Sequence, residues 1–134
     1  MKYFTHLHLH TSYSLNSGTI KIDDLINIAK KKNISSLAMT DYLNIFGAVK
    51  FYNKCVKARI KPIIGCEIPL IIEQNNRIDN IVLLCQNING YYNLNKILSS
   101  IHKLRSSNLG ASLELLKKYN SCLLYTSPSP RDSS

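Results

Sequence analysis

Apolar and polar residues recur along this chain with two different periods. From Tyr3 to Leu9 they alternate, which places successive side chains on opposite faces and is typical of a strand. From Ile22 to Ala29 the apolar residues fall at helical spacing, two aspartates supply the negative charge favoured in a first turn, and Asn33 ends the helix. The same reasoning predicts strands at 35–40, 61–72 (one or two strands around Gly65), 78–85 and 122–125, and helices at 48–56, 90–104 and 112–119. Asn75–Asn76, between two of these strands, is typical of a hairpin turn.

This succession of strands and helices predicts an α/β fold. Helices that alternate with strands over short loops indicate parallel strands joined by right-handed crossovers, and either a barrel or an open sheet would fit. In both architectures the chemistry lies at the carboxyl ends of the strands. The chain has 134 residues, which suffices for one small domain, and it shows no internal repeat.

The formal charge of +9 makes nucleic acid a candidate partner, because a basic domain attracts polyanions. The lysines are scattered, however, and only Lys30–Lys32 forms a run. This run lies where a helix is expected to end, so we interpret it as a solvated helix terminus that complements the helix dipole. A DNA-binding patch is the alternative interpretation.

The four cysteines are too far apart for a zinc knuckle or a disulfide framework, and three of them fall in apolar runs that indicate core positions. The amino terminus lacks the apolar stretch of a signal peptide, and no run approaches the length of a membrane span. We therefore expect a cytoplasmic protein without a membrane partner.

The last nine residues, 126–134, differ in composition from the rest of the chain. They are rich in Ser and Pro and contain no Ile, Lys or Asn, which are abundant elsewhere. We interpret them as a non-native tail left by sequence assembly, so that the natural chain would continue differently. The alternative is a natural Ser/Pro-rich linker.

Three histidines, His6, His8 and His10, share one face of the first predicted strand. Imidazoles at this spacing suit zinc or manganese, although an outward strand face that happens to carry His is the simpler interpretation. Asp41 and Glu67 each follow an apolar strand, so all these side chains would meet at one rim. Gly90, at the start of a predicted helix, fits a plain turn better than a phosphate site.

Four segments together resemble the PHP (polymerase and histidinol phosphatase) domain of bacterial DNA polymerase III alpha subunits. They are residues 6–15 (HLHLHTSYSL), 38–52 (AMTDYLNIFGAVKFY), 60–67 (IKPIIGCE) and 89–94 (NGYYNL). Their order and spacing fit from residue 4 to about residue 124. The phrase at 46–52 is more typical of the polymerases than of stand-alone PHP phosphatases.

The resemblance implies the first part of a distorted, TIM-like β/α barrel of the PHP type, with mainly parallel strands. Residues 1–125 would be a partial, truncated PHP domain. Active members bind up to three metal ions, and by position His8, His10 and Glu67 match ligands, with Asp41 beside them. Three further ligand positions are changed, because Ser17, Tyr42 and Asn80 stand where active members have Asp, His and His.

These changes remove charge and imidazole that a multinuclear metal site needs. Ser and Asn are weak neutral ligands, and Tyr binds well only when it is ionised. Binding of a single zinc or manganese ion by His8, His10 and Glu67 remains an alternative, since three protein ligands suffice for zinc. Our hypothesis is a degenerate PHP metal site without phosphoesterase activity.

The resemblance implies an amino-terminal fragment of a polymerase that synthesises DNA during chromosomal replication. Its Mg²⁺-dependent active site, and the contacts to DNA and deoxynucleotides, would belong to domains absent here. The PHP domain would then support the polymerase fold or dock other replicase subunits, including the proofreading exonuclease. Two alternatives are a stand-alone PHP-family metal-dependent phosphoesterase and a small non-enzymatic interaction module.

Overall fold

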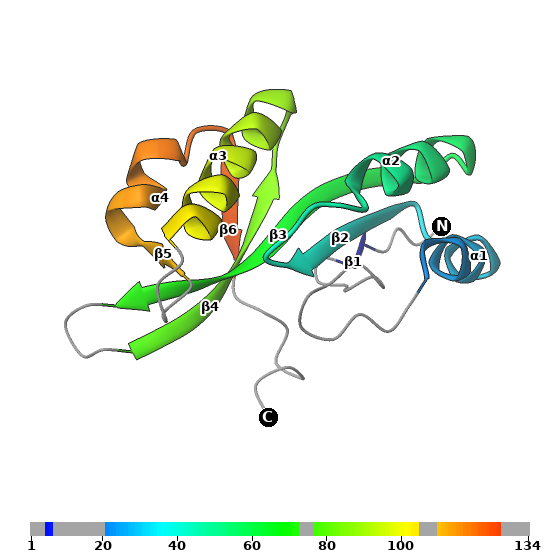
Figure 1. The fold of residues 1–134 in the computed structure, drawn as a ribbon. Coiled ribbons are helices and arrows are strands. Elements are labelled where there is room, and N and C mark those ends of the chain that lie inside the picture. The colour runs from blue at the N-terminus through cyan, green and yellow to red at the C-terminus, as the bar shows by residue number, and fades with distance from the viewer. Residues whose placement is uncertain (1–4, 7–20, 73–76, 105–109, 127–134) are drawn as a thin grey trace. The chain divides into compact units, whose positions relative to one another are not determined.

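The computed structural model describes residues 5–6, 21–72, 77–104 and 110–126. The chain divides into two compact units, Met1–Cys66 (unit 1) and Glu67–Ser134 (unit 2). The elements in Figure 1 follow the order β1 (Thr5–His6), α1 (Ile22–Lys31), β2 (Ser36–Tyr42), α2 (Ala48–Lys57), β3 (Lys61–Ile72), β4 (Arg77–Cys85), α3 (Ile88–Leu104), β5 (Ala111–Ser112), α4 (Leu113–Tyr119) and β6 (Leu123–Thr126). Strand β3 begins in unit 1 and ends in unit 2.

Unit 1 is built on β2, which has β1 and β3 as neighbours in the sheet. The β1–β2 pair is parallel, with Thr5 opposite Ser36 and His6 opposite Leu37. Every residue of β2 except Tyr42 is buried, which is the pattern of a strand covered on both faces. The strand predicted at 35–40 is therefore confirmed, and its burial and two neighbours show that it is an inner strand of the sheet.

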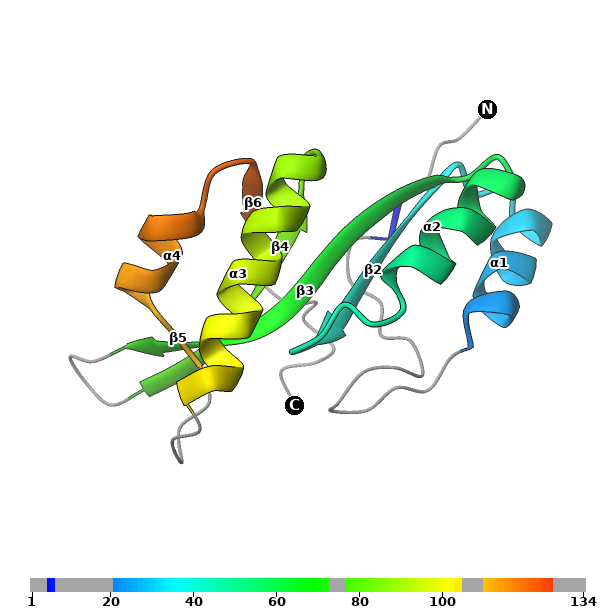
Figure 2. The ribbon, with the colours of Figure 1, turned by 45° about the horizontal axis from the view of Figure 1, so that its top comes forward.

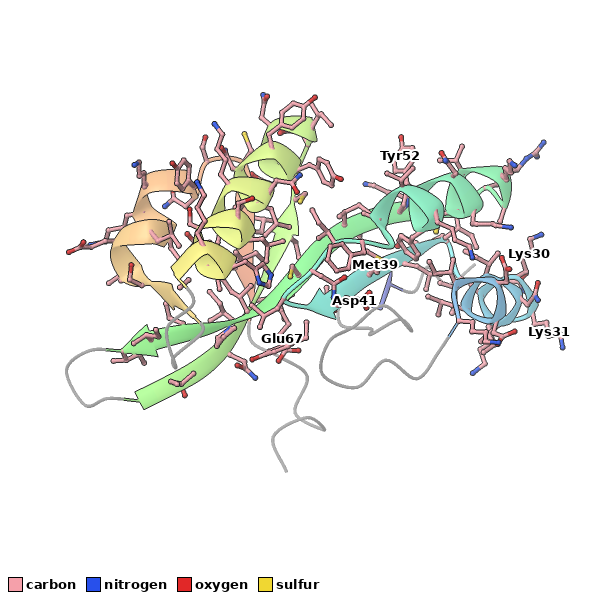
Figure 3. All side chains as sticks on the ribbon, in the orientation of Figure 1. Lys30, Lys31, Met39, Asp41, Tyr52 and Glu67 are labelled. Atoms are coloured by element: carbon pink, nitrogen blue, oxygen red, sulfur yellow. The ribbon has the colours of Figure 1, made fainter. Side chains whose placement is uncertain are left out.

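Helices α1 and α2 lie side by side, and α2 packs on β2 (Figure 2). Each helix buries residues three or four apart, which is why the helical periodicity was visible in the sequence. Lys54 Nζ of α2 and Asp23 Oδ1 of α1 form an ion pair at 3.1 Å, but both side chains are exposed, so it adds little stability. Lys30 and Lys31 occupy the last turn of α1 and point outward (Figure 3), which confirms that the lysine run ends a helix.

Both helices of unit 1 end in the same backbone motif. After α1, Asn33 adopts a left-handed φ of 55°, and the Ile34 N–H donates to the Ala29 carbonyl at 3.0 Å. After α2, Arg59 has φ 60°, and the Ile60 N–H donates to the Cys55 carbonyl at 2.8 Å. These are Schellman motifs, in which the residue after the left-handed position turns back to the helix. The two isoleucines are buried and lead directly into β2 and β3.

Unit 2 contains the carboxyl-terminal part of β3 and the strands β4, β5 and β6. Strand β5 pairs parallel with β3, whereas β6 pairs antiparallel with β4, so the sheet is mixed. Strands β3 and β4 are neighbours joined by residues 73–76, a connection too short for a parallel crossover. The predicted turn at Asn75–Asn76 lies outside the described residues. Helices α3 and α4 both lie between β4 and β6 in the chain. The chain therefore enters β6 at the end of the sheet where β4 finishes, and the two strands run antiparallel.

Helix α3 covers β4 and β6 and lies beside α4. Asn87 caps its amino terminus, with its Oδ1 accepting from the Gly90 N–H at 3.1 Å. A Cβ on Gly90 would overlap the carbonyl oxygen of Cys122, so this position requires glycine because of close backbone packing. Gly90 lies within α3, so the contact with Cys122 gives this glycine a packing role that neither the turn nor the phosphate interpretation had foreseen.

The α/β class predicted from the sequence is confirmed, while the sheet is mixed where mainly parallel strands were expected. Strand β5 was not predicted, because two residues show no periodicity. Within the described part of the chain, no helix combines the length and apolar character needed to cross a membrane.

Candidate functional site

The carboxyl end of β2 places polar side chains in the core of unit 1. The apolar run of Leu37 to Met39 is followed by Thr40 and Asp41, and the side chains of all of these residues are fully buried. Burying a polar group without compensation costs a few kcal/mol, and an unpaired charge costs more. Thr40 and Asp41 both interact with other groups of the protein, which is how the fold tolerates them. Figure 3 shows Asp41 at the end of the strand, as the sequence predicted.

The loop after β2 is held in an unusual conformation. Leu43, which is buried, has a left-handed φ of 58°, a region that costs a residue with a side chain on the order of 1 kcal/mol. Asn44 fixes the turn, because its Nδ2 donates to the Tyr42 carbonyl at 3.1 Å and its Oδ1 accepts from the Phe46 N–H at 3.1 Å. Strain and buried polar bonds beside a strand end are typical of a functional loop.

Sequence reasoning missed the importance of Asn44. The residue is 2% exposed and makes both of its turn-forming hydrogen bonds within this loop. The available signal was an asparagine just beyond a buried strand, because Asn readily bonds the backbone two residues away. Asn44 thus holds the backbone from Tyr42 to Phe46 in its turn.

Glu67, the first residue of unit 2, is buried with 3% of its surface exposed. The sequence placed it at the carboxyl end of a strand, and this was wrong, because β3 continues to Ile72. The apolar residues after Glu67 extend the strand, and Gly65 does not interrupt it. Glu67 also interacts with other groups of the protein. Asp41 therefore belongs to unit 1 and Glu67 to unit 2.

The other predicted site residues fall into two groups. His8, His10 and Ser17 lie outside the described residues. Tyr42 is half-buried at the last position of β2, and Asn80 is exposed in β4. Within the described ranges, no three His, Cys, Asp or Glu side chains gather as a metal site would require.

Two of the predicted ligand positions lie in unit 2, where Glu67 supplies a carboxylate and Asn80 an exposed neutral amide. In unit 1, Tyr42 supplies a half-buried phenol. Neutral amide and phenol groups are weaker metal ligands than carboxylate and imidazole groups.

Two of the four cysteines, Cys55 and Cys85, are unsuited to act as nucleophiles. Burial raises the pKa of the Cys55 thiol to about 12, and burial likewise raises the pKa of Cys85 to about 12. Both stay protonated at neutral pH, and a thiol attacks only as its thiolate. Cys55 and Cys66 are core residues, as expected for cysteines in apolar runs, whereas Cys85 and Cys122 are half-buried.

Comparison of the chain with known proteins shows the family to which it belongs. Residues 6–132 match the model of the PHP domain. The chain belongs to the PHP domain family. This confirms the resemblance seen in its four segments, and it extends over nearly the whole sequence.

Among its relatives are alpha subunits of DNA polymerase III, whose amino-terminal part this PHP domain matches. It is 41% identical over 135 residues to DNA polymerase III subunit alpha of Borreliella burgdorferi, which covers 92% of this chain and 12% of that protein. It is 38% identical over 101 residues to the same subunit of Buchnera aphidicola, covering 75% of this chain and 9% of that protein. The chain thus spans about a tenth of the length of these relatives.

A solved structure shares the fold. A candidate metal-dependent phosphoesterase from Bifidobacterium adolescentis superposes with a TM-score of 0.60 over 75% of this chain and 34% of that chain. The sequence identity of 16% is low, so this likeness concerns the fold alone. The α/β sheet of this PHP domain therefore resembles part of a larger PHP-type fold.

Proposed function

We propose that this chain is the PHP portion of a bacterial replicative DNA polymerase and that it serves the polymerase as a structural and docking domain. The observation that supports this most is the 41% identity with a polymerase subunit across 92% of the chain. In the proposed setting the intact protein is a cytoplasmic DNA-directed DNA polymerase. It extends a primer with deoxynucleotides, using Mg²⁺ held by carboxylates in domains outside these residues.

The second part of the proposal is that the PHP metal site is degenerate. By resemblance, His8, His10 and Glu67 remain as ligands, while Ser17, Tyr42 and Asn80 have replaced Asp, His and His. The exposed amide of Asn80 and the half-buried phenol of Tyr42 support this view, because neither brings charge to a metal cluster. A scaffold role, including contacts with other replicase subunits and the proofreading exonuclease, needs no hydrolytic chemistry.

Recovery of the uninterrupted gene tests the first part. We expect a polymerase palm domain with its carboxylates to follow the PHP region, and we expect the Ser/Pro residues 126–134 to be replaced by other sequence. A natural stop codon soon after residue 124 would overturn the proposal. It would favour a free-standing PHP phosphoesterase, the alternative that the fold of the Bifidobacterium protein supports.

Metal analysis of the full gene product tests the second part. We expect less than stoichiometric zinc and manganese and no hydrolysis of a 3′-terminal nucleotide. The triple variant Ser17→Asp, Tyr42→His and Asn80→His restores the missing donors and should gain bound manganese. The matched control Tyr42→Phe should change neither metal content nor hydrolysis. Stoichiometric metal together with hydrolysis in the unmodified protein would disprove the degenerate site.

A further inference from the structure

Helix α3 presents a basic and aromatic face on the side opposite its buried residues. The exposed members of this face are spaced by three or four residues and so lie along one side of the helix: Tyr92, Lys96, Ser99 and Lys103. The buried members, on the other side, are apolar: Leu94, Ile97, Leu98 and Ile101. Helix α3 contains no acidic residue, so nothing on the helix itself neutralises the lysines.

Helix α4 brings a third lysine, Lys118, to this face. Lys96 Nζ lies 5.8 Å from the centroid of the Tyr119 ring, and Lys118 Nζ lies 5.4 Å from the same centroid. The negative face of an aromatic ring attracts ammonium groups, so one ring can gather two cations that would otherwise repel each other. Tyr119 therefore fixes one lysine from each helix in the same neighbourhood.

This arrangement suits a chain of phosphates that also carries flat rings. Lys96 and Lys103 are about 10 Å apart along the helix axis, and Tyr92 lies about 6 Å before Lys96, at 1.5 Å per residue. The Tyr92 side chain is 56% exposed. Proteins that bind single-stranded nucleic acid combine lysines that follow the backbone with aromatic rings on which bases stack.

We propose that the α3–α4 patch, defined as Tyr92, Lys96, Lys103, Lys118 and Tyr119, binds single-stranded nucleic acid. The ammonium groups meet successive phosphates, and the exposed ring of Tyr92 stacks on a base. The inference uses the proposed function only to choose DNA rather than RNA as the first probe. Glu114 lies one helical turn before Lys118 and opposes a polyanion there, so Glu114→Gln should strengthen binding.

Lysine footprinting on the full gene product tests where the strand lies. Oligo(dT) in saturating amounts should slow acetylation of Lys96 and Lys118, as read by mass spectrometry. Lys30 and Lys31, which are exposed in unit 1, are the internal control and should react at unchanged rates. Unchanged acetylation of Lys96 and Lys118, or equal protection of all four lysines, would overturn the proposal. Neither outcome depends on whether a polymerase domain follows the PHP region.

Paired variants test the chemistry of the patch through photo-crosslinking of bromouracil-substituted oligo(dT) to the Tyr92 peptide. Lys96→Ala with Lys118→Ala should lower the crosslink yield about tenfold, whereas Lys30→Ala with Lys31→Ala, which removes the same charge, should not. Tyr92→Phe should retain binding and Tyr92→Leu should lose it, because only an aromatic ring stacks. Equal binding by the Phe and Leu variants, with displacement of the oligonucleotide by polyglutamate, would indicate an acidic protein segment instead and overturn the proposal.

Discussion

The two units of this PHP domain build similar layers but fill their cores differently. Unit 1 buries four polar side chains, one at the start of β2 and the others at its end and in the following loop: Ser36, Thr40, Asp41 and Asn44. In the described part of unit 2, Glu67 is the only buried side chain of this kind. The rest of its core is apolar, and it forms where α3 packs on β4. A buried polar group costs free energy unless it is paired, so the core of unit 1 depends on polar partners that an apolar core does not need.

Replacing Phe51 by alanine should give the largest difference in stability between the two units. Phe51 is fully buried on α2, and removing a buried aromatic side chain costs about 3–5 kcal/mol. Hydrogen exchange measured by mass spectrometry, separately for peptides of the two units, should show opening of unit 1 while unit 2 keeps its protection. The control Tyr52→Ala removes an exposed neighbour on the same helix and should have little effect. Equal loss of protection in both units would show that they open as one.

Replacing Asn44 in the loop after β2 should give the next largest loss of stability in unit 1. Asn44→Ala removes the donor to the Tyr42 carbonyl and the acceptor for the Phe46 N–H. The loss of these two part-buried hydrogen bonds together costs about 1–3 kcal/mol. Exchange at residues 41–46 should quicken accordingly. Asn44→Asp keeps the acceptor and loses only the donor, so its effect should be smaller. An alanine variant with unchanged exchange would mean that the strained Leu43 conformation is held by other contacts.

The sequence predicted the helices and most strands because their faces repeat with a regular period, as in the helix from Ile22 to Lys31. It also located Asp41 at a strand end. It placed Glu67 at a strand end because Gly65 left open a break within 61–72, whereas β3 runs without interruption from Lys61 to Ile72. The antiparallel pairing of β6 with β4 was not foreseen, because the direction of a strand depends on the connection that leads into it. The loop bonds of Asn44 depend on three-dimensional packing that no local pattern reports.

In unit 2 the comparable weak point is a backbone contact rather than a polar group. Gly90→Ala would place a Cβ against the carbonyl oxygen of Cys122, so the first turn of α3 or the start of β6 must shift, at about 1–3 kcal/mol. Exchange of the α3 and β6 peptides should increase, with unit 1 unaffected. Gly110→Ala is the matched control, because the atom nearest its Cβ belongs to the movable Ile71 side chain at 2.9 Å. A milder effect at Gly90 than at Gly110 would contradict this packing argument.

The smallest effect should be a stabilising one, and it concerns the helix ends of unit 1. Arg59 occupies the left-handed position of the second Schellman motif at φ 60°, where glycine is the preferred residue. Arg59→Gly should therefore raise the free energy of local opening at the end of α2 by about 0.4–1 kcal/mol, which would be measured as slower hydrogen exchange there. Asn33→Gly in the first motif should give a smaller gain in stability, because asparagine tolerates this conformation better than arginine does. Equal gains at the two positions would mean that the side-chain cost of the left-handed region is the same for Asn33 and Arg59. Destabilisation by Arg59→Gly would instead show that the arginine side chain contributes contacts that outweigh its backbone strain.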